Sequence, residues 1–446
     1  MTPLDARTRE GVLHGLMLCG VALAARLAFL AWLPSGTYSA DVDHWLEVDR
    51  VLSAGGNPYN LTEHLNWPPL WMQTVFAVGR LARASNLQFV TVLRAVLITV
   101  ELSSILLAYG LLRRVASPRR ALWLVIGAGA LNPVAILLIC QHCNFDIFIA
   151  VFVLLTVICV SRFAERGDPV DWLWACVFIG LGTLAKTVPL VLVPLLAFHV
   201  HRLRWSERLL GVLLVLGPVT LGMSVIYALG PAQISANVLH YRSYPGWFGI
   251  SGLMQLGGVY DWGAVYRRCF AVSFLIVVMG LIVVAVRRRR TSVEERVLLT
   301  LVLLAAVPGL GPGYSPQYIT WFLMLLPIAL AVTSSRWLRT AIPAFLAIAA
   351  ATYVIEYAMF TSHGSFWVKL HPTPEILETS ARWSTQAGQT RIRLPLFLGW
   401  LWLLAALSAR LLQSMRGGED SGHRTGRITG TTERSISRPP ASSDAP

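Results

Sequence analysis

Residues 269–286 read CFAVSFLIVVMGLIVVAV, and the arginine run Arg287–Arg290 follows directly. A helix needs about 20 predominantly apolar residues to cross the hydrocarbon core of a bilayer. Comparable segments recur along the chain, which is 55% hydrophobic and 13% charged, whereas a soluble domain carries roughly 25% charged residues. The sequence therefore predicts an all-α polytopic membrane protein.

Twelve segments are apolar enough to be interpreted as membrane spans. They are residues 12–33, 89–112, 120–139, 146–161, 171–186, 188–200, 209–229, 269–286, 297–311, 317–333, 339–360 and 394–412. We expect residues 1–412 to form one membrane-embedded domain. Residues 413–446 are rich in Ser, Gly, Arg, Thr and Pro, and a segment of this composition is expected to be a disordered cytosolic tail.

The basic residues cluster between apolar segments, although the net charge of +14 would suggest nucleic-acid binding in a soluble protein. This distribution is typical of cytosolic loops in membrane proteins. The clusters fall on one side if residues 34–88 form a single external loop, in which residues 70–81 lie on the membrane surface as an interfacial helix. Both termini are then predicted to be cytosolic, and we expect no nucleic-acid partner.

The first external loop carries two aspartates, Asp41 and Asp43, before Trp45 and the turn at residues 55–59. Carboxylates at the edge of a bilayer are costly to place and are often functional. One of them could act as a general base that removes a proton from an acceptor hydroxyl. Alternatively, either aspartate could cap a helix over residues 42–54.

A second polar group, Gln141–Asp146, lies between two apolar spans on the same external side. His142 and Asp146 are four residues apart and would share one face if this segment were helical. Asn144 lies between them. An ordinary polar connection between spans is the alternative.

Cys140 and Cys143 form a C-x-x-C pattern around His142. Such a pair is compatible with a metal site or a disulfide. A structural zinc site needs about four ligands, however, and no second Cys/His pair is evident. We therefore expect these cysteines to act as small apolar residues in the core.

Lys186 lies in the apolar run before Pro189, and the only other lysine is Lys369. A cation at the end of a span is suited to bind the phosphate of a lipid carrier. The alternative is a lysine that extends to the membrane interface.

Two further external segments carry polar side chains beside aromatic ones. His240 and Arg242 lie in residues 237–258, and Gln317 and Tyr318 follow a turn rich in Gly and Pro. Arg242 could pair with an anionic group, whereas Gln317 and Tyr318 offer hydrogen bonds. Loops and aromatic belts at a membrane interface would have a similar composition.

These elements, in their order along the chain, resemble the GT-C superfamily of integral-membrane glycosyltransferases that use polyprenyl-phosphate sugars. The likeness is greatest to the GPI first-mannosyltransferase family and to bacterial polyprenyl-phosphate-mannose-dependent mannosyltransferases. The motifs that carry it are Asp41-x-Asp43, Gly55–Tyr59, Trp67–Leu70, Asn132-Pro133, Asn144–Asp146, Lys186 with Pro189, and Ser315–Tyr318 with Trp321 and Pro327.

The resemblance implies an inverting transfer of a hexose, expected to be mannose, to a lipid or glycan acceptor on the non-cytosolic face of a bacterial plasma membrane. Asp41 or Asp43 would be the base, and Lys186 would hold the leaving lipid phosphate with help from His240 or Arg242. The sugar and acceptor pocket would be lined by His142, Asn144, Asp146, Gln317 and Tyr318.

No cofactor is implied, because a lipid-monophosphate donor has no diphosphate for a metal to bridge, although the two aspartates leave metal dependence open. The expected partners are the donor, the acceptor and membrane lipids. A transporter or lipid flippase is the competing interpretation, and a non-catalytic assembly subunit is a third. Many transporters contain internal repeats, and no repeat between the two halves of this chain is evident.

Overall fold

Helices make up nearly all of the structure. The computed structural model describes residues 6–60, 67–229, 249–258, 263–288, 291–311, 316–360 and 365–424. No strand occurs among these residues, so the predicted all-α class is confirmed. In chain order the α-helices are α1 (Ala6–Trp32), α2 (Ala40–Ser53), α3 (Pro69–Ser85), α4 (Phe89–Leu112), α5 (Pro118–Val125), α6 (Pro133–Ile136), α7 (Ile147–Arg166), α8 (Pro169–Ala185), α9 (Val193–Ala197), α10 (Trp205–Leu229), α12 (Gly249–Leu256), α13 (Gly263–Arg287), α14 (Val293–Leu310), α15 (Thr320–Leu323), α16 (Leu326–Val332), α17 (Arg336–Met359), α18 (Phe366–Leu370), α19 (Pro374–Ser384) and α20 (Gln386–Arg424).

Seven of the described helices are long and apolar enough to cross a membrane, or eight if one bent pair counts as a single span. The seven are α1, α4, α7, α10, α13, α17 and α20. This supports the predicted multi-pass membrane protein. The expected number of about twelve spans is larger because three further apolar helices, at Pro169–Ala185, Val188–Ala197 and Gln317–Val332, are shorter than a full crossing. Helix α14 also begins with charged residues.

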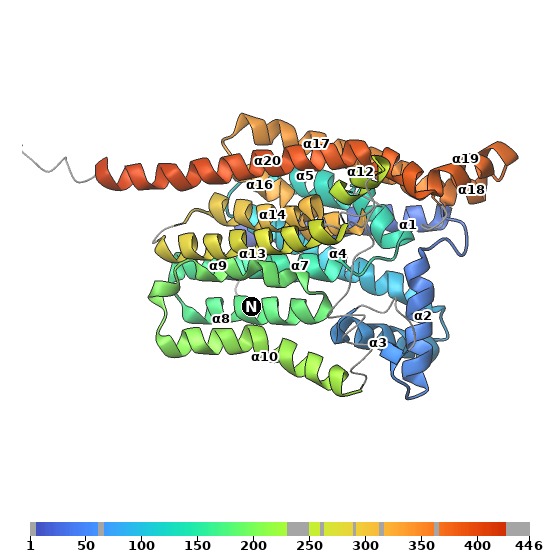
Figure 1. The fold of residues 1–446 in the computed structure, drawn as a ribbon, viewed down its shortest axis with the longest axis horizontal. Helices are drawn as coiled ribbons and strands as arrows, with labels where there is room; N and C mark the ends of the chain where they lie inside the picture. Colours follow the sequence, from blue (N-terminus) through green and yellow to red (C-terminus); the bar gives the residue numbers. More distant parts are fainter. Residues whose placement is uncertain are drawn as a thin grey trace, which may run out of the picture.

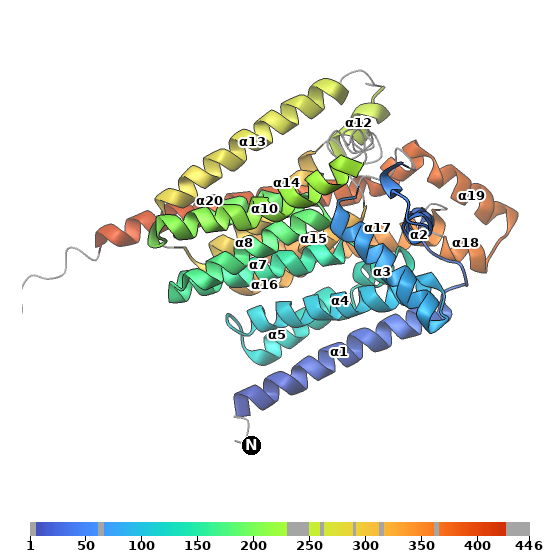
Figure 2. The same ribbon diagram turned by 90° about the horizontal axis from the view of Figure 1, so that it is seen from below.

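The start of α1 and the end of α20 lie at the same end of the bundle (Figures 1 and 2). Basic connections meet at this end. Arg114 Nη1 lies 3.7 Å from Glu165 Oε2, and Arg410 Nε donates a hydrogen bond of 2.8 Å to Glu294 Oε1. The arrangement agrees with arginine-rich connections that share one side of the membrane. The assignment of that side as cytosolic stays a prediction.

Helix α2 lies across the opposite end of the bundle, nearly perpendicular to the long helices (Figure 1). Helix α3 follows it and packs against α2, α4 and α8. The residues of α3 that face the protein recur with helical spacing: Trp71, Met72, Val75, Val78, Gly79 and Ala82 are buried. Because α3 is not one of the candidate spans, the segment at residues 34–88 does not require a crossing.

The segment predicted as a span over residues 120–139 is broken. Its two halves, Pro118–Ala130 and Pro133–Gln141, meet at an angle of 47°. Asn132 caps the second half, because its Oδ1 accepts a hydrogen bond of 2.9 Å from the backbone N–H of Val134. Proline at the first position of this half starts the new helix without losing a needed N–H donor.

A buried arginine satisfies the backbone at this break. Arg26 of α1 donates to the carbonyl oxygens of Ala130 and, at 3.2 Å, Gly129. Its guanidinium also forms an ion pair with Glu101 of α4, with an Nε to Oε2 distance of 2.9 Å. The two side chains are 0% and 1% exposed. Because unpaired carbonyls are costly inside a membrane, this pair stabilises the broken helix.

Helix α20 continues to Arg424, beyond residue 412 where the sequence analysis ends the membrane domain. Residues 413–424 are therefore helical, and the disordered cytosolic tail stays a prediction. Residues 425–446 lie outside the described part of the chain.

Candidate active site

The first turn of α2 distinguishes the two aspartates of the external loop. Ser39 is the N-cap residue of α2, so the alternative in which Asp41 or Asp43 caps this helix is wrong. The Ser39 hydroxyl instead donates a hydrogen bond of 2.8 Å to the carbonyl oxygen of His142. The Asp41 side chain is 36% exposed. Asp43 is exposed and makes no hydrogen bond or ion pair with a residue that the structure describes.

The His142 ring lies between Asp41 and a tyrosine of α17. Its Nε2 lies 3.3 Å from Asp41 Oδ2, and its Nδ1 is hydrogen-bonded to the hydroxyl of Tyr357. An ionised carboxylate can only accept hydrogen bonds. With Asp41 ionised, Nε2 therefore carries the proton and the Tyr357 hydroxyl donates to Nδ1. Tyr357 thus fixes both the ring orientation and the tautomer that faces Asp41.

The turn that carries His142 is not helical throughout. Cys143 has a φ of 62°, in the left-handed region, which ends the helical segment after His142. Asn144 Oδ1 accepts a hydrogen bond of 2.7 Å from the N–H of Asp146, and Asp146 is the N-cap residue of α7. The expectation that His142 and Asp146 share one helical face is therefore wrong, although both lie at the same turn.

Lys186 follows the last residue of α8 and contacts the N-terminus of α7. Its Nζ donates a hydrogen bond of 2.7 Å to Asp146 Oδ1. The Asp146 side chain is fully buried, and that of Lys186 is 18% exposed. Lys186 therefore turns toward a buried carboxylate, unlike a lysine that extends to the membrane interface. An ammonium group has three donors, and this ion pair uses one.

Aromatic rings surround the Lys186 ammonium group. Its Nζ lies 4.6 Å from the ring centroid of Tyr318 and 5.2 Å from those of Phe145 and Trp321. Tyr318 and Trp321 stack with their centroids 4.3 Å apart. A cation over several ring faces is attracted to their negative charge density, so these rings hold the ammonium group in place.

Tyr318 lies beside one of the two charged pairs. Its ring lies against the Lys186 ammonium group, which pairs with Asp146, and the His142 that faces Asp41 lies four residues before Asp146 in the same turn. The structure therefore brings Asp41, His142, Asp146, Lys186 and Tyr318 to one end of the bundle. Gln317 lies in the same 3₁₀ turn, Pro316–Ile319.

A cluster of aromatic side chains fixes α2 and α3 to this turn. Trp71 of α3 stacks on Phe145, with centroids 4.5 Å apart and planes 21° apart. Trp45 of α2 packs edge-on against Trp71 at 5.1 Å. Stacked and edge-on aromatic pairs contribute about 0.5–1.5 kcal/mol each beyond their buried area. The pairs set the position of the first turn of α2 relative to His142.

Two of the residues predicted to bind substrate, His240 and Arg242, lie outside the described residues. Their expected contribution to binding the leaving phosphate stays a prediction.

The six cysteines are all free thiols, and Cys140 and Cys143 are buried. Among the described ranges, no group of three or more His, Cys, Asp and Glu side chains is arranged to hold a metal ion. The C-x-x-C pattern thus forms no disulfide.

Tyr357 is not among the residues that the sequence predicted for the site. It lies within an expected span, where a tyrosine is an ordinary residue. The neighbouring Glu356 could have drawn attention to this part of the span, because ionisable residues inside spans are rare. Glu356 is fully buried and pairs with Arg393 of α20, just as Glu101 pairs with Arg26.

The comparison with known families is consistent with this geometry. Residues 70–227 match the family described as dolichyl-phosphate-mannose-protein mannosyltransferase. The match covers α3 to α10 and therefore includes His142, Asp146 and Lys186, whereas Asp41 lies before it. No curated protein matches the chain. Together with the all-helical membrane fold, the family match supports a membrane glycosyltransferase of the GT-C superfamily.

Proposed function

We propose that this protein is an inverting hexosyltransferase that moves mannose from a polyprenyl-phosphate-linked donor to a hydroxyl of a lipid or glycan acceptor. The observation that carries the proposal is that two charged pairs are formed by one turn, residues 142–146. Asp41 with His142 offers a base, and Lys186 with Asp146 offers a cation. Transfer to an alcohol requires both, because the alcohol loses a proton while the donor phosphate gains negative charge.

Asp41 is the base in this mechanism. The acceptor oxygen attacks the anomeric carbon, and its proton passes to the Asp41 carboxylate. A bond forms between that oxygen and the anomeric carbon as the bond from this carbon to the phosphate oxygen breaks. The phosphate oxygen takes the bonding electron pair, and the single displacement inverts the anomeric centre. His142 orients Asp41, and Tyr357 orients His142.

Lys186 stabilises the leaving phosphate. Its ammonium group keeps two donors beyond the one given to Asp146, and its side chain retains some exposure. The aromatic rings hold the cation before substrate arrives, so little reorganisation is needed during the reaction. His240 and Arg242, which are basic, are candidates to bind the same phosphate.

The polar atoms around Asp146 fit a sugar-binding role. Its Oδ2 and the Nδ2 of Asn144 are buried without a hydrogen-bond partner among the described residues. Buried polar atoms are nearly always paired with protein, water or ligand. We assign them, with Gln317 and Tyr318, to the part of the pocket that binds sugar and acceptor hydroxyls. The arginine-rich connections at the opposite end of the bundle support a reaction on the non-cytosolic face.

The decisive experiment measures transfer with purified protein, a radiolabelled polyprenyl-phosphate-mannose donor and an extract of membrane lipids as acceptor. Asp41→Asn is expected to lower the rate by about 10²–10⁴-fold, the usual contribution of a positioned base. Asp43→Asn is the matched control, because Asp43 lies two residues further along the chain, is exposed, and loses the same charge. It should retain at least about half of the wild-type rate.

Size-exclusion profiles of both variants should match that of the wild type. Loss of transfer in Asp43→Asn but not in Asp41→Asn would move the base to Asp43. Absence of transfer by the wild type with mannose, glucose, arabinose and galactose donors would contradict the proposal and favour a transporter. That alternative predicts movement of a labelled lipid across liposome membranes that contain the protein.

A further inference from the structure

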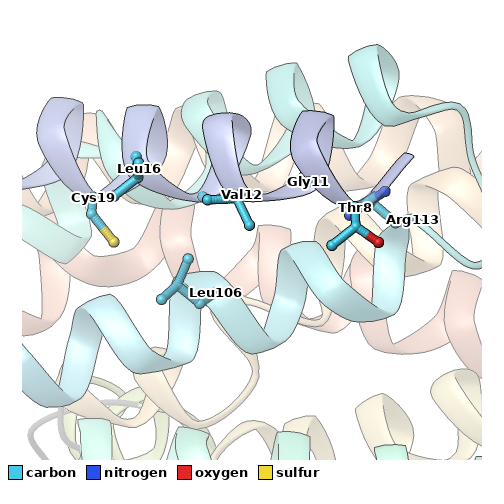
Figure 3. Close-up of a pocket in the computed structure, with 8 residues that line it drawn as sticks. Thr8, Gly11, Val12, Leu16, Cys19, Leu106 and Arg113 are labelled. Carbon is cyan, nitrogen blue, oxygen red and sulfur yellow. The ribbon is translucent and has the colours of Figure 1, made fainter. Parts of the chain in front are cut away.

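A groove of about 580 Å³ lies between α1 and α4, far from the candidate active site along the bundle. Figure 3 shows Val12, Leu16, Cys19 and Leu106 along the groove, with Thr8 and Arg113 together at one end. Most of the lining is therefore apolar, and the polar groups are confined to that end. Slots of this kind on the outside of a span match the two parts of a lipid, a charged head and an apolar chain.

Two glycines of α1 make room for the groove. A Cβ atom on Gly11 would lie 1.9 Å from Arg113 Nη1, so the guanidinium rests directly against the backbone of α1. A Cβ atom on Gly15 would lie 3.5 Å from Leu106 Cδ2. Larger side chains at position 11 would displace the arginine. The glycine therefore permits a cation at this end of the groove.

The position of Arg113 is also set by aromatic contacts. Its guanidinium carbon lies 5.6 Å from the ring centroid of Tyr109, one turn earlier on α4. The Tyr109 hydroxyl is hydrogen-bonded to His14 Nδ1 of α1 at 2.7 Å. Contacts from both helices thus hold the arginine near one place, and an ordered guanidinium loses less entropy when it binds an anion.

The groove and the candidate active site lie at opposite ends of α4. Arg94, near the start of α4, donates a hydrogen bond of 2.6 Å to the carbonyl oxygen of Thr37, just before α2. Arg113 directly follows the last residue of α4. A helix of 24 residues is about 36 Å long at 1.5 Å per residue. A phosphate on Arg113 therefore cannot be the leaving group near Lys186.

We propose that this groove binds an anionic glycerophospholipid from the leaflet at the arginine-rich end of the bundle. The lipid phosphate would pair with Arg113, and one acyl chain would lie along Val12, Leu16 and Leu106 toward Cys19. A guanidinium binds phosphate oxygens through two parallel hydrogen bonds. It also repels the cationic headgroup of a zwitterionic lipid, so charge complementarity selects the anionic lipid. The surrounding membrane supplies this lipid directly. The proposal does not depend on the chemistry at Asp41.

The test measures phospholipid retained by the full-length protein in detergent, using native mass spectrometry after size exclusion. Phosphatidylglycerol and phosphatidylcholine are added back separately at equal concentrations. Arg113→Gln removes the cation, and Leu106→Trp fills the slot without a change of charge. Arg119→Gln is the matched control, because it removes one positive charge from an exposed site at the same end of α4 and α5.

Wild type and Arg119→Gln should retain phosphatidylglycerol in preference to phosphatidylcholine. Arg113→Gln should bind phosphatidylglycerol about tenfold more weakly or worse, as expected from the loss of a charge-assisted contact. Leu106→Trp should weaken binding to a similar extent, because its ring occupies the place of the acyl chain. An equal loss in Arg119→Gln would show general surface attraction and overturn the proposal. Undiminished retention in Leu106→Trp would also overturn it. If Arg113→Gln does not fold, Leu106→Trp decides the result alone.

Discussion

The Nζ atom of Lys186 lies 2.7 Å from Oδ1 of Asp146, and this contact joins the end of α8 to the first turn of α7. The Asp146 carboxylate is fully buried, so it depends on Lys186 for charge compensation. Removal of one partner from a buried ion pair costs about 3–5 kcal/mol, because the other charge stays behind without compensation. Lys186 therefore has a structural role in addition to the phosphate contact that we propose.

Substitutions at this pair separate the two roles. Lys186→Met should lower both the stability and the transfer rate, because Asp146 becomes an isolated buried charge. The double variant Lys186→Met/Asp146→Asn should recover much of the stability, since both charges are gone. It should not recover transfer. Thermal unfolding in detergent and the mannosyl-transfer assay measure these effects on the same preparations.

Lys186→Arg is the matched control for charge. It keeps a cation but replaces the compact ammonium group with a larger planar group. The ammonium group lies among the aromatic side chains of Phe145, Tyr318 and Trp321. Stability close to wild type with reduced transfer would agree with a placed phosphate contact. If the double variant transferred mannose at the wild-type rate, Lys186 would have no part in the reaction.

Tyr357 gives a second prediction, because His142 joins it to Asp41. Tyr357→Phe removes the hydroxyl that orients the imidazole and leaves the ring. We expect kcat to fall about tenfold, a modest part of the effect of a positioned base, with little change in KM.

Tyr353→Phe, one turn earlier on α17, removes a hydroxyl from the same helix and serves as the control. Its ring stacks on that of Tyr357 with centroids 6.1 Å apart. A purely structural effect would lower kcat in both variants alike. An equal fall of kcat in the two variants, or a change confined to KM in Tyr357→Phe, would exclude the positioning role.

The membrane spans were largely predictable, since apolar length is a local property of the chain. The break at Asn132 was not, although Asn132-Pro133 signals a helix start. Averaging over residues 120–139 hides two polar or helix-breaking residues among many apolar ones. The break becomes visible only with Arg26, which lies more than 100 residues earlier in the chain and donates to the carbonyls on its N-terminal side.

The candidate site also contains residues that the sequence could predict and residues that it could not. Asp41, Asp146 and Lys186 could be found because a charged residue next to an apolar run is unusual. Which residues pair with one another could not be predicted. Lys186 meets Asp146 across 40 residues, and His142 meets Tyr357 across 215. Such pairs depend on how helices pack, and the local turn at Cys143 also changed the direction expected for His142.

Gly79 of α3 gives a third prediction, which concerns the support of α2. A Cβ atom on Gly79 would lie 2.0 Å from Asp49 Oδ1. Asp49 of α2 in turn accepts hydrogen bonds from Arg83 of α3, at 2.5 and 3.2 Å. Gly79→Ala should therefore displace Asp49, loosen α2 and destabilise the protein by about 1–3 kcal/mol, a typical cost of overpacking. Transfer should also fall, because α2 carries Asp41.

Two variants check this interpretation by thermal unfolding and by transfer. Gly217→Ala in α10 adds the same methyl group where no atom lies within 4 Å of the new Cβ, and it should be neutral or slightly stabilising. Asp49→Ala/Gly79→Ala removes the clashing carboxylate, so its loss should be smaller than the sum of the single losses. Additive losses would show that Gly79 and Asp49 do not act on each other.

The last prediction concerns Arg26, which has two sets of acceptors inside the membrane. It pairs with Glu101, and it also donates to the carbonyls of Gly129 and Ala130 at the break. Arg26→Met removes both sets of contacts and should cost about 3–5 kcal/mol. Glu101→Gln removes only the carboxylate charge, and Arg26 keeps its carbonyl acceptors, so this variant should cost less. The double variant Arg26→Met/Glu101→Gln should recover only part of the loss, since the Ala130 carbonyl loses the Arg26 donor in a medium without water. Thermal unfolding of the four proteins in one detergent gives the order directly. If Glu101→Gln proved as costly as Arg26→Met, or the double variant matched the wild type, the ion pair alone would account for the buried arginine, and the break in the helix would need another source of stability.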